Sequence, residues 1–296
     1  MKPATIRQCV QGIAAQDGAG VKLSRIIGQP LLQNLDPFLM LDEFGSADAN
    51  DYLPGFPPHP HRGFQTVTYM LQGKMRHRDS VGNDGVIESG GIQWMNAGKG
   101  IIHEEMPEQE SGVLRGFQLW VNLPADEKMS APDYQDIRPS AVPSVHLTHD
   151  VQMKLLSGTY ADRVGPVTNP NSQRAVPFFA DLTARDRTQL RMSLQPEYQY
   201  FLYVYEGAVS IANKTVSKGV LATLDQADII DLMVEQPDTQ WILVGGQPIG
   251  EPIVQYGPFV MNTHQEIEQA ITDYPHCPLS TSDPADKRTR VDPGGR

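Results

Sequence analysis

The stretch HPHRGFQTVTY, residues 59–69, combines two histidines with the start of a β-strand. Successive side chains of an extended segment point to opposite faces, so His59 and His61 share one face and Pro60 points to the other. Proline also disfavours the helical conformation for the residue before it, which keeps this segment extended. The alternating run that follows, with its threonines and tyrosine, is typical of a strand. The stretch therefore presents two imidazoles side by side where a sheet begins.

Short alternating or apolar runs of this kind recur along the chain, whereas helical periodicity is scarce. In GFQLWVNL, residues 116–123, every second side chain is apolar, and the opposite face carries Gln118, Trp120 and Asn122. Glycine, proline and Asn-Asp-Gly separate the runs, as turns do between strands. Many short strands joined by turns predict an all-β fold, either a sandwich or a barrel.

A segment rich in proline and charge, residues 124–145, divides this pattern in two. We expect a first β domain at 1–123, a linker at 124–145, a second β domain at 146–279 and a disordered tail at 280–296. Residues 69–73 (YMLQG) and 203–207 (YVYEG) each open into a second strand, which indicates a duplicated β-barrel. Thr263 and Glu266 form a capping box before an apolar helical stripe, so one late helix is expected to pack on the barrel.

Composition limits the class of protein. The chain has 296 residues, a formal net charge of -11 and a pI near 5.1. This acidic balance argues against direct nucleic-acid binding, which relies on phosphate attraction. No apolar leader or membrane-spanning run is present, so no membrane association is expected. The two cysteines, Cys9 and Cys277, lie far apart in sequence, which favours a cytoplasmic protein without a disulfide framework.

A second histidine motif lies in AGKGIIHEEMPE, residues 97–108. Strand alternation places Glu105 on the face of His103 and Glu104 on the opposite face. His59, His61, His103 and Glu105 together would form a mixed nitrogen and oxygen set suited to iron, manganese, cobalt, nickel, copper or zinc. Such a set leaves coordination positions open, which is typical of catalytic metal sites.

The remaining polar and aromatic candidates are expected to have structural roles. His77 and Asp79 are expected in a solvated hairpin turn, and His146 and His149 on the surface. Arg62 should point away from the metal site and form a packing or ion-pair contact. Structural roles are also expected for three further side chains. Trp94 and Trp120 are expected in the core, and His264 in the first turn of the late helix.

Four blocks of this sequence jointly resemble the pirin family: HPHRGFQTVTY (59–69), GNDGVIESGGIQWMNAGKGIIHEEMP (82–107), DPFLMLDEFG (36–45) and GEPIVQYGPFVMNT (250–263). The resemblance implies a bicupin, with two face-to-face β-barrel domains and a C-terminal helix. It also implies one iron ion, held in the first domain by the positions His59, His61, His103 and Glu105. Gln65 departs from the family's usual glutamate, which would alter hydrogen bonding around the metal without removing it.

Two functions are compatible with these residues. The resemblance to bacterial pirins implies a quercetin 2,3-dioxygenase activity on a flavonol and O2, with Glu105 as metal ligand and catalytic base. The resemblance to the human member, a nuclear transcriptional coregulator, implies an iron-dependent, redox-sensitive regulator that binds a protein partner. We favour the enzyme and expect a monomer. The second domain is expected to lack metal, since Ser193 and Gln195 occupy the positions that correspond to His59 and His61.

Overall fold

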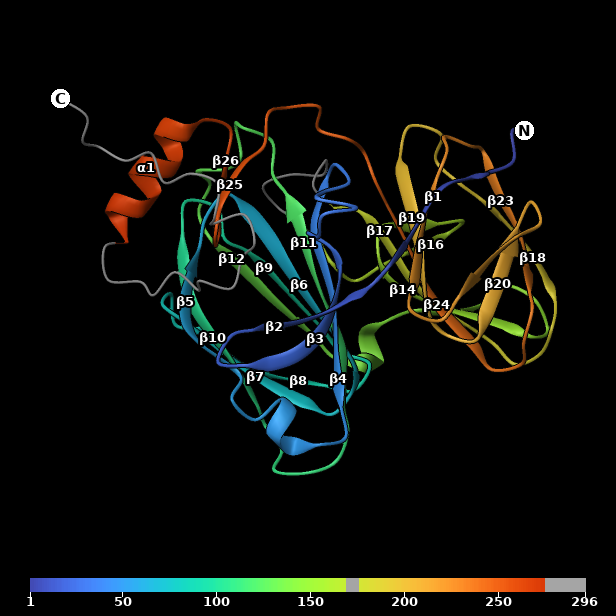
Figure 1. The fold of residues 1–296 in the computed structure, drawn as a ribbon, viewed down its shortest axis with the longest axis horizontal. Coiled ribbons are helices and arrows are strands. Elements are labelled where there is room, and N and C mark those ends of the chain that lie inside the picture. The colour runs from blue at the N-terminus through green and yellow to red at the C-terminus, as the bar shows by residue number, and fades with distance from the viewer. Residues whose placement is uncertain (169–175, 275–296) are drawn as a thin grey trace.

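The computed structural model describes residues 1–168 and 176–274. Two seven-stranded antiparallel sheets pack face to face at its centre, and each is paired with a four-stranded sheet (Figure 1). This is the all-β, two-cupin architecture with one C-terminal helix that the sequence and its resemblance predict. The expected tail, 280–296, lies outside the described residues.

The first domain holds the large sheet β12-β9-β6-β11-β4-β3-β2 and the small sheet β5-β10-β7-β8. The strands of its large sheet are β2 (Ile13–Asp17), β3 (Val21–Ile27), β4 (Phe38–Ser46), β6 (Phe64–Gln72), β9 (Ile92–Asn96), β11 (Leu114–Asn122) and β12 (Asp133–Ile137). Those of its small sheet are β5 (Phe56–His61), β7 (Lys74–Asp79), β8 (Asp84–Glu88) and β10 (Ile101–Pro107). A short 3-10 helix, η1 (Ala49–Asp51), follows β4.

The second domain repeats this plan, with the large sheet β1-β22-β19-β24-β17-β14-β13 and the small sheet β18-β23-β20-β21. The strands of its large sheet are β1 (Ile6–Gln11), β13 (Ser144–His146), β14 (Val151–Ser157), β17 (Phe178–Ala184), β19 (Gln199–Glu206), β22 (Val220–Leu224) and β24 (Thr239–Gly246). Those of its small sheet are β18 (Gln189–Ser193), β20 (Ala208–Ile211), β21 (Lys214–Ser217) and β23 (Ile229–Val234). The two strand orders correspond position by position, which confirms the internal duplication.

The remaining elements are short. They are η2 (Pro139–Ala141), β15 (Thr159–Tyr160), β16 (Arg163–Val164), β25 (Val254–Tyr256), β26 (Phe259–Met261) and α1 (His264–Asp273). The capping box predicted for the helix is formed, because the Thr263 side chain accepts from the Glu266 backbone and Glu266 caps in return. Among the described residues, no helix has the length and apolar character needed to cross a bilayer.

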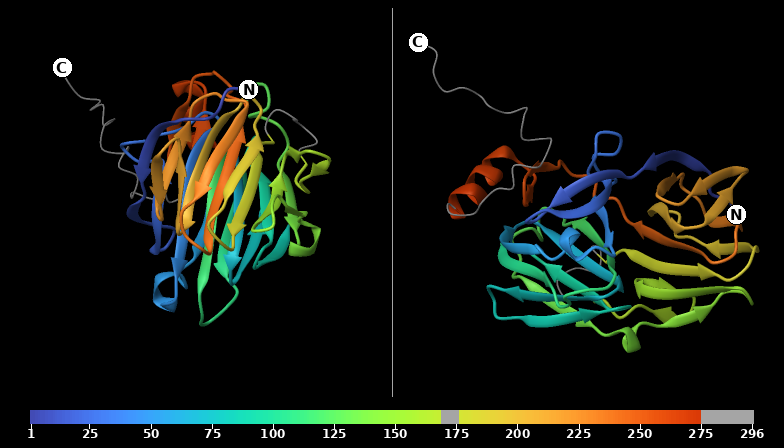
Figure 2. Two further views of the ribbon diagram at one scale, coloured as in Figure 1. Left: turned by 90° about the vertical axis from the view of Figure 1, so that its right-hand side faces the viewer. Right: turned by 60° about the horizontal axis from the view of Figure 1, so that its bottom comes forward.

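Segments cross between the domains (Figure 2). β1 pairs with β22 of the second domain, and β12, from the segment expected as a linker, pairs with β9 of the first. β25, β26 and α1 lie beside the first domain, where Arg62 pairs with Phe259 through an isolated bridge. Arg62 Nη1 also lies 2.7 Å from Asp273 Oδ2, which confirms its predicted ion-pair role. The C-terminal segment is therefore fastened to the domain that carries both histidine motifs.

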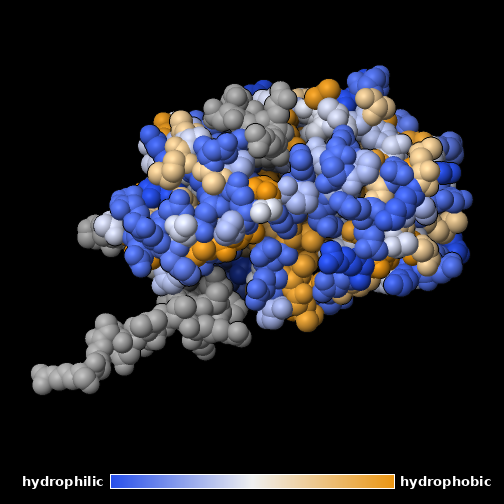
Figure 3. All heavy atoms as spheres, turned by 90° about the horizontal axis from the view of Figure 1, so that it is seen from above, coloured by the Kyte–Doolittle hydropathy of each residue, from blue (hydrophilic) through white to orange (hydrophobic). Residues whose placement is uncertain are grey.

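The interface between the large sheets forms a continuous apolar core. Its members come from both domains, for example Val67 and Phe117 from the first and Phe201, Ile242 and Val244 from the second. The interior of the second domain is filled by its own cluster of apolar side chains. The face of the molecule seen in Figure 3 is mostly hydrophilic, with hydrophobic residues between polar ones.

Candidate metal centre

The strand pair β5–β10 brings the two histidine motifs together. The strands run antiparallel, and His103 on β10 is the direct partner of His59 on β5. Gly98 and Gly100, in the turn before β10, adopt positive φ values of 47° and 137°, which glycine tolerates far better than other residues. A β-carbon at Gly100 would clash with the Tyr274 hydroxyl, so a larger residue there would displace the Tyr274 side chain. Turn and register thus place three imidazoles at one point.

The spacing of these imidazoles fits a metal ion. His59 Nε2 lies 3.0 Å from His61 Nε2 and 3.0 Å from His103 Nε2. Two nitrogen ligands about 2.1 Å from a metal, at right angles to each other, lie about 3.0 Å apart. Among the described residues, His59, His61 and His103 are the group of metal-ligating side chains whose donor atoms all lie within 4.8 Å of one another. The spacings from His59 to His61 and from His59 to His103 therefore match adjacent positions around one metal ion.

Protonation of the ring nitrogens also suits a metal. His59 Nδ1 lies 2.8 Å from the Pro57 carbonyl, which only accepts hydrogen bonds, so the proton of a neutral His59 is on Nδ1 and Nε2 carries a lone pair. Burial, and then the charge of neighbouring His59, hold the pKa of both His61 and His103 well below 6.5. Neutral imidazole is the form that binds metals.

His61 supplies a further sign that a group is needed here. Its side chain is 2% exposed, and its Nδ1 atom makes no well-formed hydrogen bond with the described residues. The neighbouring Pro258 carbonyl raises its pKa only weakly against the effect of burial. Since a carbonyl oxygen only accepts, the Pro258 contact favours the proton on Nδ1 and leaves the lone pair on Nε2, which faces His59.

Glu105 points into the same interior as His103, as strand alternation predicts. Its side chain is 4% exposed, and Oε1 accepts a hydrogen bond of 2.7 Å from the Thr68 hydroxyl on β6. Glu104 points outward and lies 3.4 Å from Arg78. The Glu105 carboxylate is outside the group of converging histidine nitrogens. It lines the cavity next to them instead, so its role as a fourth ligand is a proposal.

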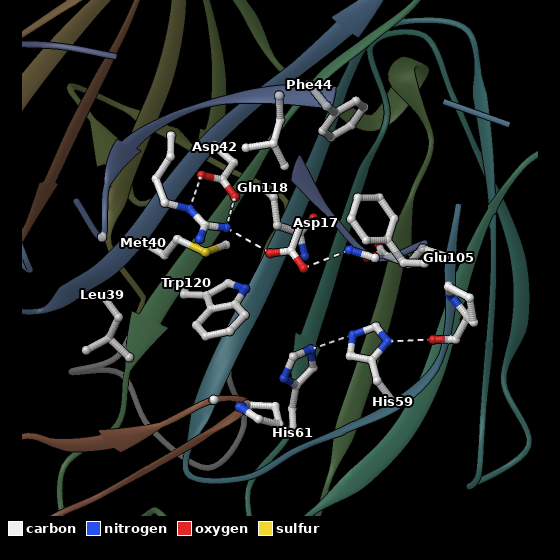
Figure 4. Close-up of a pocket in the computed structure, with 18 of the residues that line it drawn as sticks. Asp17, Leu39, Met40, Asp42, Phe44, His59, His61, Glu105, Gln118 and Trp120 are labelled. Atoms are coloured by element: carbon white, nitrogen blue, oxygen red, sulfur yellow. Dashed lines mark hydrogen bonds and ion pairs between the residues drawn. The ribbon is translucent and has the colours of Figure 1, made fainter. Parts of the chain in front are cut away.

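A cavity of about 320 Å³ opens onto His59, His61 and Glu105 (Figure 4). Aromatic and aliphatic side chains form much of its wall, namely Leu23, Leu39, Met40, Phe44, Phe56 and Trp120. Gln118 points into the cavity between Trp120 and Glu105. This volume is within the range of about 300–1,000 Å³ that is usual for small-molecule sites.

One wall of the cavity is fixed by charge. Arg25 forms a two-pronged contact with Asp42, at 3.0 Å and 2.8 Å, and a third contact of 2.8 Å with Asp17. Burial raises the pKa of Asp42 to about 6, against the opposing effect of Arg25. Nε and Nη2 of the guanidinium are held by these two carboxylates, which stiffens the wall formed by β2, β3 and β4.

The expectation of a core position for Trp120 is wrong, because its side chain lines this cavity and contacts His61, with ring centroids 5.1 Å apart. The alternation of β11 places Trp120 and Gln118 on the face opposite the apolar residues. That alternation was the signal for a lining position.

The expectation of a solvated turn for His77 and Asp79 is wrong. Both side chains are fully buried on and at the end of β7, and His77 Nδ1 lies 3.4 Å from His103 Nδ1. The inward alternation of Met75, His77 and Asp79 along β7 was the available signal. His146 and His149 are exposed, as predicted.

Comparison with known proteins agrees with this structure. The family model Pirin matches residues 20–121, and the model described as Pirin C-terminal cupin domain matches residues 179–279. A pirin-like protein of Caulobacter vibrioides is 45% identical over 270 residues, covering 91% of this chain and 96% of its own. Human pirin is 37% identical over 264 residues, covering 87% of this chain and 88% of its own.

Among solved structures, quercetin 2,3-dioxygenase from Acinetobacter baumannii superposes with a TM-score of 0.84 and 32% identity. The match covers 92% of this chain and 97% of that chain. Family models, curated relatives and solved structure all extend over both domains. The chain therefore belongs to the pirin family.

Proposed function

We propose that this pirin is a metal-dependent dioxygenase, with iron as the resident metal, that cleaves flavonols such as quercetin with O2. The observation that supports this most is the position of the three converging imidazoles at the wall of a largely apolar cavity. A purely structural metal site is closed by protein ligands, whereas this one faces a space that a small molecule can enter. The similarity to a quercetin 2,3-dioxygenase structure points to the same chemistry.

In this proposal His59, His61 and His103 hold the metal, and Glu105 completes the set. When bound, the metal supplies the redox chemistry of oxygen activation, which amino-acid side chains do not provide. The protein positions the substrate and excludes water from the site. Trp120, Phe44 and Phe56 offer flat apolar surfaces against which a planar aromatic substrate can lie, and their bulk excludes water from the reacting face.

Glu105 is proposed as the base that accepts the substrate's hydroxyl proton. Its carboxylate lines the cavity beside His59 and His61, and Thr68 holds it in place. Loss of the proton makes the flavonol ring electron-rich, so that oxygen can attack it. Both oxygen atoms then enter the opened product, and one ring carbon leaves as carbon monoxide.

The test follows flavonol absorbance under air and under argon, with metal content measured in the same samples. Glu105→Gln should slow flavonol consumption by about 10²–10⁴-fold, the usual cost of removing a general base. Glu104→Gln is the matched control, because this neighbouring carboxylate points out of the barrel. Metal-loaded protein that consumes neither flavonol nor oxygen would overturn the enzymatic proposal in favour of the regulatory function.

A further inference from the structure

A chain of hydrogen bonds runs behind the candidate metal centre, away from the cavity. Asp79 Oδ2 lies 3.1 Å from His77 Nε2, and His77 Nδ1 lies 3.4 Å from His103 Nδ1. His103 Nε2 faces His59 Nε2 on the other side of its ring. All three side chains of this chain are at most 1% exposed, so no bulk water competes for these bonds.

The direction of the chain is set at Asp79. Its Oδ1 accepts from the backbone N–H groups of Val81 and Asn83, both at 3.0 Å, and its Oδ2 accepts from Asn83 Nδ2 at 2.7 Å. Burial raises the pKa of Asp79, but these hydrogen bonds outweigh it and hold the pKa below the usual range. Asp79 is therefore an ionised carboxylate that can only accept a hydrogen bond from His77 Nε2–H.

The ionised Asp79 fixes the tautomer of His77, and His77 in turn fixes the tautomer of His103. Since His77 Nε2 must donate to Asp79, the Nδ1 atom of neutral His77 carries a lone pair. His103 Nδ1 must then donate to His77, which leaves the lone pair of His103 on Nε2. That nitrogen is the one that lies 3.0 Å from His59 Nε2. Two lone pairs face each other at this distance, an arrangement that a cation relieves.

The His77 ring is also held in orientation. Tyr134 of β12 stacks on it, with ring centroids 4.6 Å apart and an interplanar angle of 23°. Gly85 makes room for this contact, since a β-carbon there would lie 2.6 Å from the Tyr134 hydroxyl. The segment that contains β12 thus covers the outer side of the Asp79–His77–His103 hydrogen-bond chain.

We propose that Asp79 and His77 are positioning residues that fix the tautomer of His103, so that Nε2 is the atom offered to the metal. The inference rests on the proposed metal site. It assigns a role to two residues that contact neither cavity nor metal, and that act only through the His103 ring.

Asp79→Asn is the informative variant, because it preserves the shape of the side chain and reverses the direction of its hydrogen bond with His77. The oxygen of the substituted amide can still accept from the backbone N–H groups of the turn. Its NH2 group, in the place of Oδ2, donates to His77 Nε2 and to the Asn83 side chain, whose amide flips to present its oxygen. His77 then carries its proton on Nδ1 and donates to His103 Nδ1, which moves the His103 proton onto Nε2. The binding nitrogen is blocked without loss of packing.

The first measurement is Zn²⁺ affinity of the full chain, by competition with a chromogenic chelator. Asp79→Asn should weaken Zn²⁺ binding by about 10–100-fold, the usual effect of losing such a partner. Asp136→Asn is the control for charge alone. Burial raises the pKa of Asp136, and the charges of Arg138 and His77 partly offset this effect. Asp136 is therefore close enough to His77 to interact with it electrostatically. The two side chains share no hydrogen bond in the described structure. The affinity of this control should match that of the unmodified chain.

The second measurement is the histidine ¹⁵N NMR spectrum of the metal-free protein, which reports the tautomer directly. His103 should carry its proton on Nδ1 in the unmodified chain and on Nε2 in Asp79→Asn. An Nε2-protonated His103 in the unmodified chain, or equal Zn²⁺ affinity of the two proteins, would overturn the proposal. Failure of the metal site itself is distinguished by His61→Ala, which would then bind Zn²⁺ as tightly as the unmodified chain.

Two substitutions of His77 cover the case in which Asp79→Asn disturbs folding. His77→Gln keeps an acceptor for His103 and a donor for Asp79 in one side chain, so it should retain most of the Zn²⁺ affinity. His77→Phe keeps the stacking on Tyr134 but lacks both groups, and it should lose affinity about as much as Asp79→Asn. Equal Zn²⁺ affinities of the His77→Gln and His77→Phe proteins would contradict the proposed positioning of His103 by His77.

Discussion

The Thr68 hydroxyl anchors the Glu105 carboxylate, with Oγ1 and Oε1 2.7 Å apart. The same hydroxyl lies 2.7 Å from Gln118 Oε1. One proton cannot serve both oxygens, so the Gln118 amide must turn its NH2 group toward Thr68 when Glu105 is ionised. The candidate base is thereby tied to β6, an inner strand of the first large sheet, and to a side chain that lines the cavity.

Thr68→Val should therefore destabilise the protein and slow flavonol consumption while metal content stays unchanged. Removing the hydroxyl leaves the buried Glu105 carboxylate without this donor and the Gln118 amide without this acceptor, at a cost of about 1–3 kcal/mol in the free energy of unfolding. Urea unfolding and the flavonol assay measure the two effects. Thr66→Val, on the same strand, is the control, since the buried Thr66 hydroxyl has no hydrogen-bond partner in the described structure. Equal losses in both variants would show that Thr68 does not hold Glu105.

His61→Ala should abolish stoichiometric metal binding. His61 is buried within the histidine group, and its removal leaves too few imidazoles for tight binding. Elemental analysis of native-purified protein measures this. His146→Ala, at an exposed position of the second domain, should keep full metal content. Full metal content in His61→Ala would show that the ion binds elsewhere.

A fall in pH should lower the free energy of unfolding of the metal-free protein more steeply than that of a chain of the same size without buried histidines. Burial lowers the pKa of both His61 and His103 in the folded state, so the unfolded state binds more protons below pH 6.5. The stabilisation is complete above about pH 6.5 and is lost as the pH falls, by up to about 1.4 kcal/mol per pH unit for each histidine.

Urea unfolding of chelator-treated protein between about pH 7.5 and pH 5.5 measures this slope. His61→Phe should make the slope shallower, because one of the two buried titrating rings is gone. His149→Gln should leave it unchanged, since the His149 side chain is 98% exposed. A slope that does not change in His61→Phe would contradict the assignment.

The two domains should unfold as one unit, because a buried carboxylate joins them. Asp181 of β17 accepts from Tyr69 of β6 at 2.6 Å and from Tyr205 of β19 at 2.5 Å. Tyr69→Phe removes the contact that crosses between domains and should cost about 1.5–3 kcal/mol, as hydrogen bonds to charged groups do. Calorimetry should still show a single transition in the unmodified chain. Two separate transitions would contradict the joint core.

The sequence determined the local features of this protein by itself. Alternation along an extended strand is a property of the backbone, so it placed His59 with His61, and His103 with Glu105, on common faces. The capping box of α1 and the repeated strand–glycine–strand units are equally local, and the structure contains both. These patterns are enough to predict an all-β protein with two barrels and a candidate metal set.

Only the tertiary structure decided which residues surround that set. The register of β10 against both β5 and β7 brings His77 and Asp79 behind His103, although the sequence pattern of their hairpin resembles a solvated turn. The chain order likewise does not show that α1 lies beside the first domain or that β1 completes the sheet of the second. Such relationships arise from strand register and from packing between segments distant in sequence, whereas alternation and capping act between near neighbours.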